Sequence, residues 1–540
     1  MKKYLDAIKL ICGCLVLVGQ VALAGVIGGR DQPGPVNLGQ TTANTLTVNA
    51  DGIGHILLLP YYSAQGGNAT ILSLTNTDYL NGKAVKVRFR GATNGDSVLD
   101  LTVFLAPNDV WNGLVSQDPS TGSAQLTSAD SSCTLPSLSS GNALRFSGSR
   151  LRPGLSSSEV VSHTLEGYVE LMTMANIPAL GTVAATAGSL FKSISRQATG
   201  GVRACNSATL LATQVETTSE AAAAAQGFAT PTTGIQGSWT IVNVPRTLTF
   251  SGDALAIEAR DSSGLPARAN FVFFAQSTDA ASNVDSLTAD PMLRLTPLAA
   301  KTAAGVATAY VPQSGSLPIV KAVWSDFPDI STPYLEGASM PTFQAAQLSK
   351  IMAVKSVINE YATEPGIGAA SDWVLSMPAR RYSVGADFRQ SQPVLVYSLV
   401  TAAGNAEYFS SANSSVANGL ICTLAEDQTF FDREAAGRHQ PAGSTNPQAV
   451  TPLSLCGAVP VLKFANESAL AASVSVVQAG AASVNGWATL NTKNSALISA
   501  ITTTTGIPLI GASFIKASNP VSAPGVSGNY GIVSPHSFSR

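Results

Sequence analysis

Residues 55–115 read HILLLPYYSAQGGNATILSLTNTDYLNGKAVKVRFRGATNGDSVLDLTVFLAPNDVWNGLV, and this stretch decides the fold class. Within it, Val85, Val87 and Phe89 alternate with three basic residues, and similar alternation recurs at 71–75 and 98–105. Successive side chains of a strand point to opposite faces of its sheet, so a period of two indicates half-buried strands. The stretch therefore predicts three consecutive β-strands.

Asn81-Gly82 separates the first two strands and favours a tight hairpin, because a type I′ turn needs positive φ at both central residues. A two-residue turn there would pair Leu74 with Phe89, and both side chains are apolar. The turn and the pattern agree, so we expect a three-stranded antiparallel meander.

Asn94-Gly95 separates the second and third strands, but a two-residue turn at this point would pair Phe89 with Asp100. That register would place an acid on the core face, since a slip of one residue exchanges the two faces. We therefore predict an odd-length loop or a β-bulge that pairs Phe89 with Leu99.

Lys86, Arg88 and Arg90 form the basic face of the middle strand. Half-buried antiparallel sheets usually turn such a face to solvent. The functional alternative is a patch that binds anionic polysaccharide, with Trp111 as an aromatic ring that stacks on sugars. Asp96 and Asp100 lie nearby and would partly neutralise this patch.

The composition excludes some classes of partner. The chain has 540 residues, of which 12% are charged, and a net charge of −2 argues against nucleic acid. No apolar run after the N-terminus reaches membrane-spanning length. Few charges suit a protein whose surface is largely covered by other copies of itself or by other layers.

Residues 1–24 read as a signal peptide, with a basic start, an apolar stretch and small residues at the cleavage position. Four cysteines follow it, and an even number in an exported chain indicates disulfides. Of the three possible pairings we favour Cys133–Cys205 and Cys422–Cys456, because shorter loops close more readily. The cysteine spacing fits no zinc motif.

The overall pattern predicts a mainly β protein made of antiparallel, Ig-like β-sandwich domains with few helices. We expect a flexible arm at 25–45, a β-sandwich domain at 46–290 with an insertion at 116–234, and a second β-rich domain at 291–540. Helical spacing of apolar residues predicts one clear helix at 343–361. A serine before five alanines predicts a short helix at 219–227.

Several segments resemble a family of exported proteins of Gram-negative bacteria that are described as cell surface proteins. The resembling segments are YYSAQGGNATILSLTNT, KAVKVRFR and LAPNDVW near the front, INEYATEPGIGAASDWVLSMPARR and FFDREAAG later, and NYGIVSPHSFSR at the end. They span nearly the whole mature chain, and residues 116–234 match least. The resemblance implies location and architecture, and it carries no activity.

No motif for metal binding, phosphate binding or nucleophilic catalysis stands out, so we expect no cofactor, no metal and no enzymatic activity. The leading hypothesis is an exported structural protein of the cell surface, a self-associating coat or filament subunit. The alternative is a surface-exposed polysaccharide-binding module or adhesin, and a hydrolase built from dispersed residues ranks third. The expected partners are further copies of the chain or cell-surface polysaccharide. The expected location is the cell surface or the extracellular space, with the periplasm as the alternative.

Overall fold

The computed structural model describes residues 26–540 except 139–140, 149–150, 152–154, 180–188, 197–200, 215–216, 218, 274–297, 302–306, 312–318, 322–333, 336–340, 388–393, 398–407, 435–436, 439–451, 482, 494–505 and 524–525. The predicted signal peptide and the domain boundary expected near 291 lie outside these residues. The described part is mainly β and its sheets are antiparallel except at one short strand pair, as predicted.

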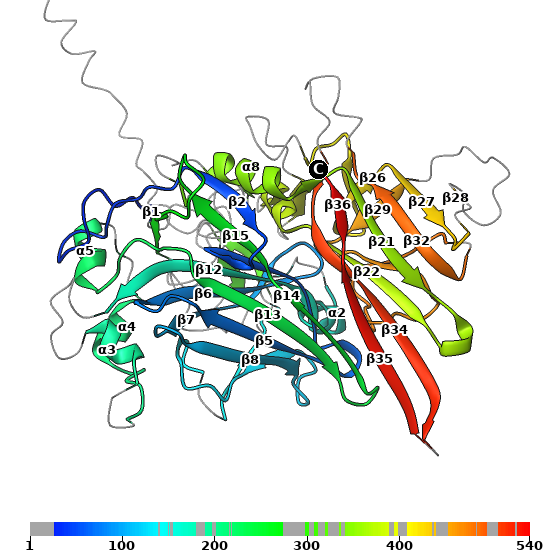
Figure 1. Cartoon of the computed structure of the whole chain (residues 1–540), viewed down its shortest axis with the longest axis horizontal. Helices are drawn as coiled ribbons and strands as arrows, with labels where there is room; N and C mark the ends of the chain where they lie inside the picture. Colours follow the sequence, from blue (N-terminus) through cyan, green and yellow to red (C-terminus); the bar gives the residue numbers. More distant parts are fainter. Residues whose placement is uncertain are drawn as a thin grey trace, which may run out of the picture.

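The first half of the chain forms a sandwich of two seven-stranded sheets, on the left of Figure 1. The first, called the β6 sheet, has the order β10 (Cys133–Leu135), β7 (Ser97–Leu105), β6 (Asn81–Gly91), β12 (Glu166–Pro178), β4 (Ile56–Ser63), β15 (Leu255–Arg260) and β2 (Thr45–Asn49). The second, called the β5 sheet, has the order β11 (Ala143–Arg145), β9 (Ala124–Thr127), β8 (Val110–Gln117), β5 (Asn68–Asn76), β13 (Ile235–Asn243) and β14 (Leu248–Asp253), and β3 (Ile53–Gly54) also pairs with β13.

The core of this sandwich follows from the period-two pattern. Leu72 and Leu74 of β5 face Val87 and Phe89 of β6 within one hydrophobic cluster, together with Trp111 of β8. Each of these side chains is buried, and burying one of this size stabilises the fold by roughly 1.5–3 kcal/mol.

The predicted register is confirmed in one hairpin and wrong in the other. Phe89 pairs with Leu99 between β6 and β7, and the register shifts between Phe89 and Arg90, as a β-bulge requires. By contrast, β5 pairs with β8 and β13, not with β6, so the meander with Leu74 opposite Phe89 is wrong. Asn81-Gly82 begins β6 after a crossover between the two sheets. Gly82 is needed there for space, because a Cβ would lie 2.8 Å from the Leu105 carbonyl oxygen.

Residues 116–234 are not simply an insertion. The strand expected near 163–174 is present as β12, whose residues are almost all buried, and it lies in the middle of the β6 sheet between β6 and β4. Strands β9, β10 and β11 extend both sheets. The same region also contains four short helices, α2 (Ser157–Thr164), α3 (Leu190–Ile194), α4 (Ala208–Ala212) and α5 (Glu220–Ala225). The Ser219 side chain caps α5, as predicted.

The expected flexible arm at 25–45 packs against the sandwich instead of projecting from it. Strand β1 (Val26–Ile27) pairs with β16 (Phe271–Val272), and Leu38 is fully buried. The Glu220 carboxylate accepts a hydrogen bond from the Leu38 N–H at 2.9 Å. The glycines and polar residues of this segment predicted mobility, whereas one buried leucine and backbone pairing fix it.

The second half has two five-stranded sheets, on the right of Figure 1. The β22 sheet has the order β31 (Val476–Gln478), β30 (Val461–Lys463), β22 (Ala370–Ser376), β34 (Ile510–Ala523) and β35 (Val526–Pro535), and the β21 sheet has the order β28 (Gly437–Arg438), β27 (Asp427–Phe431), β32 (Asn485–Asn491), β21 (Ser356–Ala362) and β36 (Ser537–Ser539). Two of the smaller sheets have two strands each, β17 (Leu298–Lys301) with β18 (Ala307–Val311), and β20 (Ala353–Val354) with β33 (Ile507–Pro508). Two others have three strands each. One has the order β19 (Ile319–Lys321), β23 (Val384–Asp387), β24 (Val394–Tyr397), and the other has the order β25 (Ser414–Ala417), β26 (Leu420–Ala425), β29 (Leu453–Cys456).

The helix predicted at 343–361 ends early. Helix α8 covers Pro341–Met352, and residues 356–362 form β21. Val357 and Tyr361 are spaced four apart, which fits a helix, but they also alternate with exposed neighbours in a period of two. The strand prevails because β21 pairs with both β32 and β36.

The two halves pack closely against each other. Phe514 of β34 is fully buried and its ring contacts Tyr61, Trp239 and Phe250, all from the first half. Nearby, β35 approaches β14 so closely that a Cβ on Gly531 would lie 2.0 Å from the Thr249 carbonyl oxygen. In Figure 1 these strands meet where the two halves adjoin.

Both predicted disulfides are present, Cys133–Cys205 and Cys422–Cys456, with S–S distances of 2.01 and 2.08 Å. Each bridge lies within one half of the chain. In the described part of the chain, no helix combines the length and the apolar character needed to cross a membrane.

Candidate functional site

The basic residues first considered for polysaccharide binding do not form a surface. Lys86, Arg88 and Arg90 are fully buried, so the expectation of a solvated outer face is wrong. The second half covers them: Leu348 of α8 and Tyr382 of η3 (Pro378–Ser383) belong to the hydrophobic cluster that lies over this face of the β6 sheet. A period of two shows that a strand has two different faces. It does not show whether the polar face is exposed to water or packed against another part of the protein.

Acidic side chains compensate the buried cations. Arg88 lies directly opposite Asp100 on one neighbouring strand and Glu170 on the other. The Arg90 Nε lies 3.3 Å from the Glu170 Oε2, and both side chains are at most 1% exposed. This row of charges is a structural ion-pair network at the contact between the two halves.

The aromatic part of the expected patch is buried as well. Trp111 is fully buried between the sheets, so it cannot stack on a sugar in this structure. The tryptophan that is exposed among the described residues, Trp487, stacks on Phe431 with ring centroids 3.9 Å apart and an angle of 9°. These residues face each other across β27 and β32, so each ring covers one face of the other and the pair stabilises the sheet.

Two buried carboxylates hold one loop of the second half. Glu166 of β12 accepts hydrogen bonds from the Ser473 N–H at 2.9 Å and from the Tyr61 hydroxyl at 3.2 Å. Asp372 of β22 accepts from the Ser468 hydroxyl at 2.5 Å and the Leu470 N–H at 2.9 Å. Burial raises the pKa of Glu166 to about 7 and that of Asp372 to about 6, although the hydrogen bonds oppose the rise.

We expect Glu166 to make stability fall as the pH rises. The pKa of Glu166 in the folded protein is about 7, above its usual 4.5. The stability that the protonated side chain contributes is therefore fully present below pH 4.5 and is lost as the pH rises through 7. At about 1.4 kcal/mol per pKa unit, the contribution is about 3 kcal/mol. The Glu166→Gln variant should therefore gain stability relative to the wild type between pH 4.5 and 7, as denaturant unfolding at several pH values will measure.

The wild type has to be compared with the Glu166→Gln variant, because two buried histidines make stability change with pH in the opposite direction. Burial lowers the pKa of His55 and of His536 to about 3, so their contribution is lost as the pH falls from 6.5 to 3. Glu467→Gln is the matched control, because Glu467 lies near the same loop and is 80% exposed. Parallel pH profiles for wild type and Glu166→Gln would contradict the expectation.

The β5 sheet presents a broad face to solvent. Its outward side chains lie in rows that cross the strands, and one row runs from Leu114 through Ile71 and Thr240 to Ser251. In the four central strands β9, β8, β5 and β13, no outward side chain is charged, whereas the edge strands β11 and β14 carry the exposed Arg145 and Asp253. The face includes three exposed large apolar residues, Ile71, Val110 and Leu114, at 40%, 39% and 37%. Surfaces of soluble domains normally carry roughly a quarter or more charged residues, so an uncharged face of this width is unusual.

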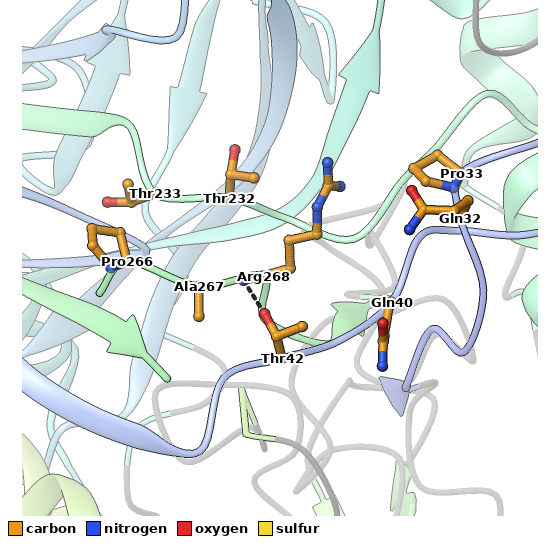
Figure 2. A pocket seen from close by; sticks show the side chains of 9 residues that line it. All are labelled: Gln32, Pro33, Gln40, Thr42, Thr232, Thr233, Pro266, Ala267 and Arg268. Carbon is orange, nitrogen blue, oxygen red and sulfur yellow. Dashed lines mark hydrogen bonds between the residues drawn. The ribbon is translucent and has the colours of Figure 1, made fainter. Parts of the chain in front are cut away.

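A pocket of about 410 Å³ lies where the N-terminal segment crosses the sandwich (Figure 2). Three segments form it, and the lining residues are Gln32, Pro33, Gln40, Thr42, Thr232, Thr233, Pro266, Ala267 and Arg268. The backbone of Arg268 is tied to the N-terminal segment, since its N–H donates to the Thr42 hydroxyl at 3.2 Å and its carbonyl accepts from the Thr42 N–H at 2.9 Å. The packed segment at 25–45 is therefore one wall of the pocket.

Lys83 lies behind the pocket wall and is fully buried. Its Nζ donates to the Thr232 carbonyl and to the Asn176 amide oxygen, both at 2.9 Å, and lies 3.6 Å from the Asp78 carboxylate. Burial lowers the pKa of Lys83 to about 8, Asp78 opposes this, and Arg268 adds to it. Asp78 balances the charge of Lys83, which leaves Arg268 as the cation that faces the pocket.

This pocket could not be predicted from the sequence, because its walls are distant in the chain and carry no motif. A signal could have come only from Gly39, whose φ of +98° favours glycine and whose missing Cβ leaves space for Arg268. Among the described residues, no group of three or more His, Cys, Asp or Glu side chains is placed to hold a metal ion.

Comparison with protein-family models, with curated proteins and with solved structures found no match for this chain.

Proposed function

We propose that this chain is an exported structural protein of the cell surface whose copies associate through the outer face of the β5 sheet. The observation that carries the proposal is the face around Ile71 and Leu114, whose four central strands carry no outward charge. The two disulfides add support, since such bonds persist in oxidising compartments outside the cytoplasm.

The size of the face suits association with a second copy. Strands about 4.8 Å apart, about 13 Å long for β9 and about 26–30 Å long for β8, β5 and β13, give the four uncharged strands an area of roughly 500 Å². Stable protein interfaces bury about 800 Å² on each partner, so the edge strands and the loops at the rim need to add the remaining third or so. Because the four central strands carry no outward charge, association through them also avoids the cost of burying unpaired charges.

Leu114→Glu tests this proposal because it places one charge in the middle of the face. We expect the wild type to associate with rising concentration and Leu114→Glu to associate at least about tenfold more weakly, because a buried unpaired charge costs well over 1.4 kcal/mol. Sedimentation velocity of the purified mature protein over a range of concentrations measures this directly.

Val416→Glu is the matched control, since Val416 is 45% exposed and lies on β25 in the second half of the chain, outside the β5 sheet. It makes the same charge change and should associate as the wild type does. A wild type that stays monomeric at every concentration, or a Leu114→Glu variant that associates equally well, would overturn the proposal.

The alternative, a polysaccharide-binding module, no longer has the site first expected for it, because Lys86, Arg88, Arg90 and Trp111 are buried. The described residue that best replaces them is Arg268 in the polar pocket.

A further inference from the structure

Arg268 is held in an unusual setting for a surface arginine. A Cβ built on Gly39 would lie 3.2 Å from the Arg268 Nη1 and 2.8 Å from the Pro33 Cγ. The guanidinium therefore lies against the N-terminal segment, at the end of the pocket formed by Gln32 and Pro33. In Figure 2 its side chain extends toward these two residues and away from Thr42.

The guanidinium group has no protein partner in the part of the chain that the structure describes. Its backbone is hydrogen-bonded to Thr42 and Ala43, but no hydrogen bond or ion pair of the side chain to a described residue is present. Asp78, an acid behind the pocket wall, is already engaged by Lys83 and by the N–H groups of Leu80 and Asn81. A guanidinium presents its donors in a planar fork that matches a carboxylate.

The remaining lining determines what else the ligand carries. Gln32, Gln40, Thr42, Thr232 and Thr233 supply amides and hydroxyls, which both donate and accept hydrogen bonds. Pro33 and Pro266 supply apolar walls. This combination suits a compact body rich in hydroxyl groups, and a volume of about 410 Å³ falls within the usual range for small-molecule sites.

We propose that this pocket binds a sugar acid, a hexuronic acid unit, with its carboxylate on the Arg268 guanidinium and its hydroxyls on the glutamine and threonine side chains. The site lies on the N-terminal segment and the loops before β13 and β16, and it is separate from the outer face of the β5 sheet. The proposal does not rest on self-association, and the two can fail independently.

Isothermal titration calorimetry of the mature protein with glucuronate and galacturonate tests the assignment, with glucose, galactose, acetate and inorganic phosphate as the comparison ligands. We expect saturable binding of at least one hexuronate that weakens as salt is added, and much weaker binding of the neutral sugars. Acetate or phosphate that binds as tightly as the hexuronates would overturn the sugar assignment.

The variants Arg268→Gln and Arg268→Lys distinguish the effect of the positive charge from that of the planar guanidinium geometry. Arg268→Gln should lose hexuronate affinity by at least tenfold, and Arg268→Lys should lose less because it keeps the charge. Arg196→Gln, an exposed arginine outside the pocket, is the matched control and should bind as the wild type does. Circular dichroism checks that each variant is folded, and equal affinity of Arg268→Gln and wild type would overturn the proposal.

Discussion

Replacing Phe514 with alanine is expected to lower the free energy of unfolding by about 3–5 kcal/mol. Phe514 belongs to the second half of the chain, yet its ring contacts Tyr61, Trp239 and Phe250 of the first half at centroid distances of 6.4, 5.6 and 5.4 Å. The substitution leaves a cavity in the cluster that the two halves share, and the aromatic contacts are lost with it.

Denaturant unfolding followed by tryptophan fluorescence measures this loss. Ile532→Ala is the control on the same hairpin, because Ile532 is 54% exposed, and it should cost less than about 1 kcal/mol. Equal losses for the two variants would mean that Phe514 does not join the halves.

Replacing Arg90 with methionine is expected to cost about 3–5 kcal/mol, because it removes one partner of a buried ion pair and leaves the Glu170 carboxylate buried. In the variant, Glu170 still accepts a hydrogen bond from the Tyr168 hydroxyl at 3.2 Å and still lies opposite Arg88 on the neighbouring strand. These interactions place the expected loss at the lower end of this range. Thermal and denaturant unfolding of the variant measure the loss.

Two further variants distinguish charge from packing. The double variant Arg90→Met with Glu170→Gln should recover part of the loss, since no unpaired carboxylate remains. Arg145→Met breaks an ion pair with Asp118 in which the arginine is 62% exposed, so it should cost less than about 1 kcal/mol. If Arg90→Met cost no more than Arg145→Met, the buried network would contribute little.

Local patterns predicted local structure well. The pairing of Phe89 with Leu99 depends only on a short loop and the alternation of two neighbouring strands, and it is confirmed. The disulfide pairs also followed from short separations along the chain.

Long-range partners could not be predicted in the same way. Strands β5 and β6 have suitable patterns and a favourable Asn-Gly between them, yet they belong to different sheets. Their partners are β13 and β12, which lie much further along the chain. A pattern of alternation specifies the two faces of a strand, and it does not specify the neighbour on either side.

The functional sites could not be predicted correctly for the same reason. Arg88 and Trp111 have the residue types of a polysaccharide site, but tertiary packing buries both. Arg268 stands in an ordinary loop, and only the crossing of the N-terminal segment turns that loop into a pocket. The uncharged face of the β5 sheet became visible only when the cross-strand rows were known.

The most direct test of the central claim is electron microscopy of intact cells and of material sheared from them, with antibody labelling, for wild type and Leu114→Glu. We expect the wild-type protein to be labelled on unbroken cells and to appear as an ordered layer or fibre, and we expect Leu114→Glu to be exported but dispersed. A wild-type protein released only when the cells are broken, as separate single particles, would contradict it.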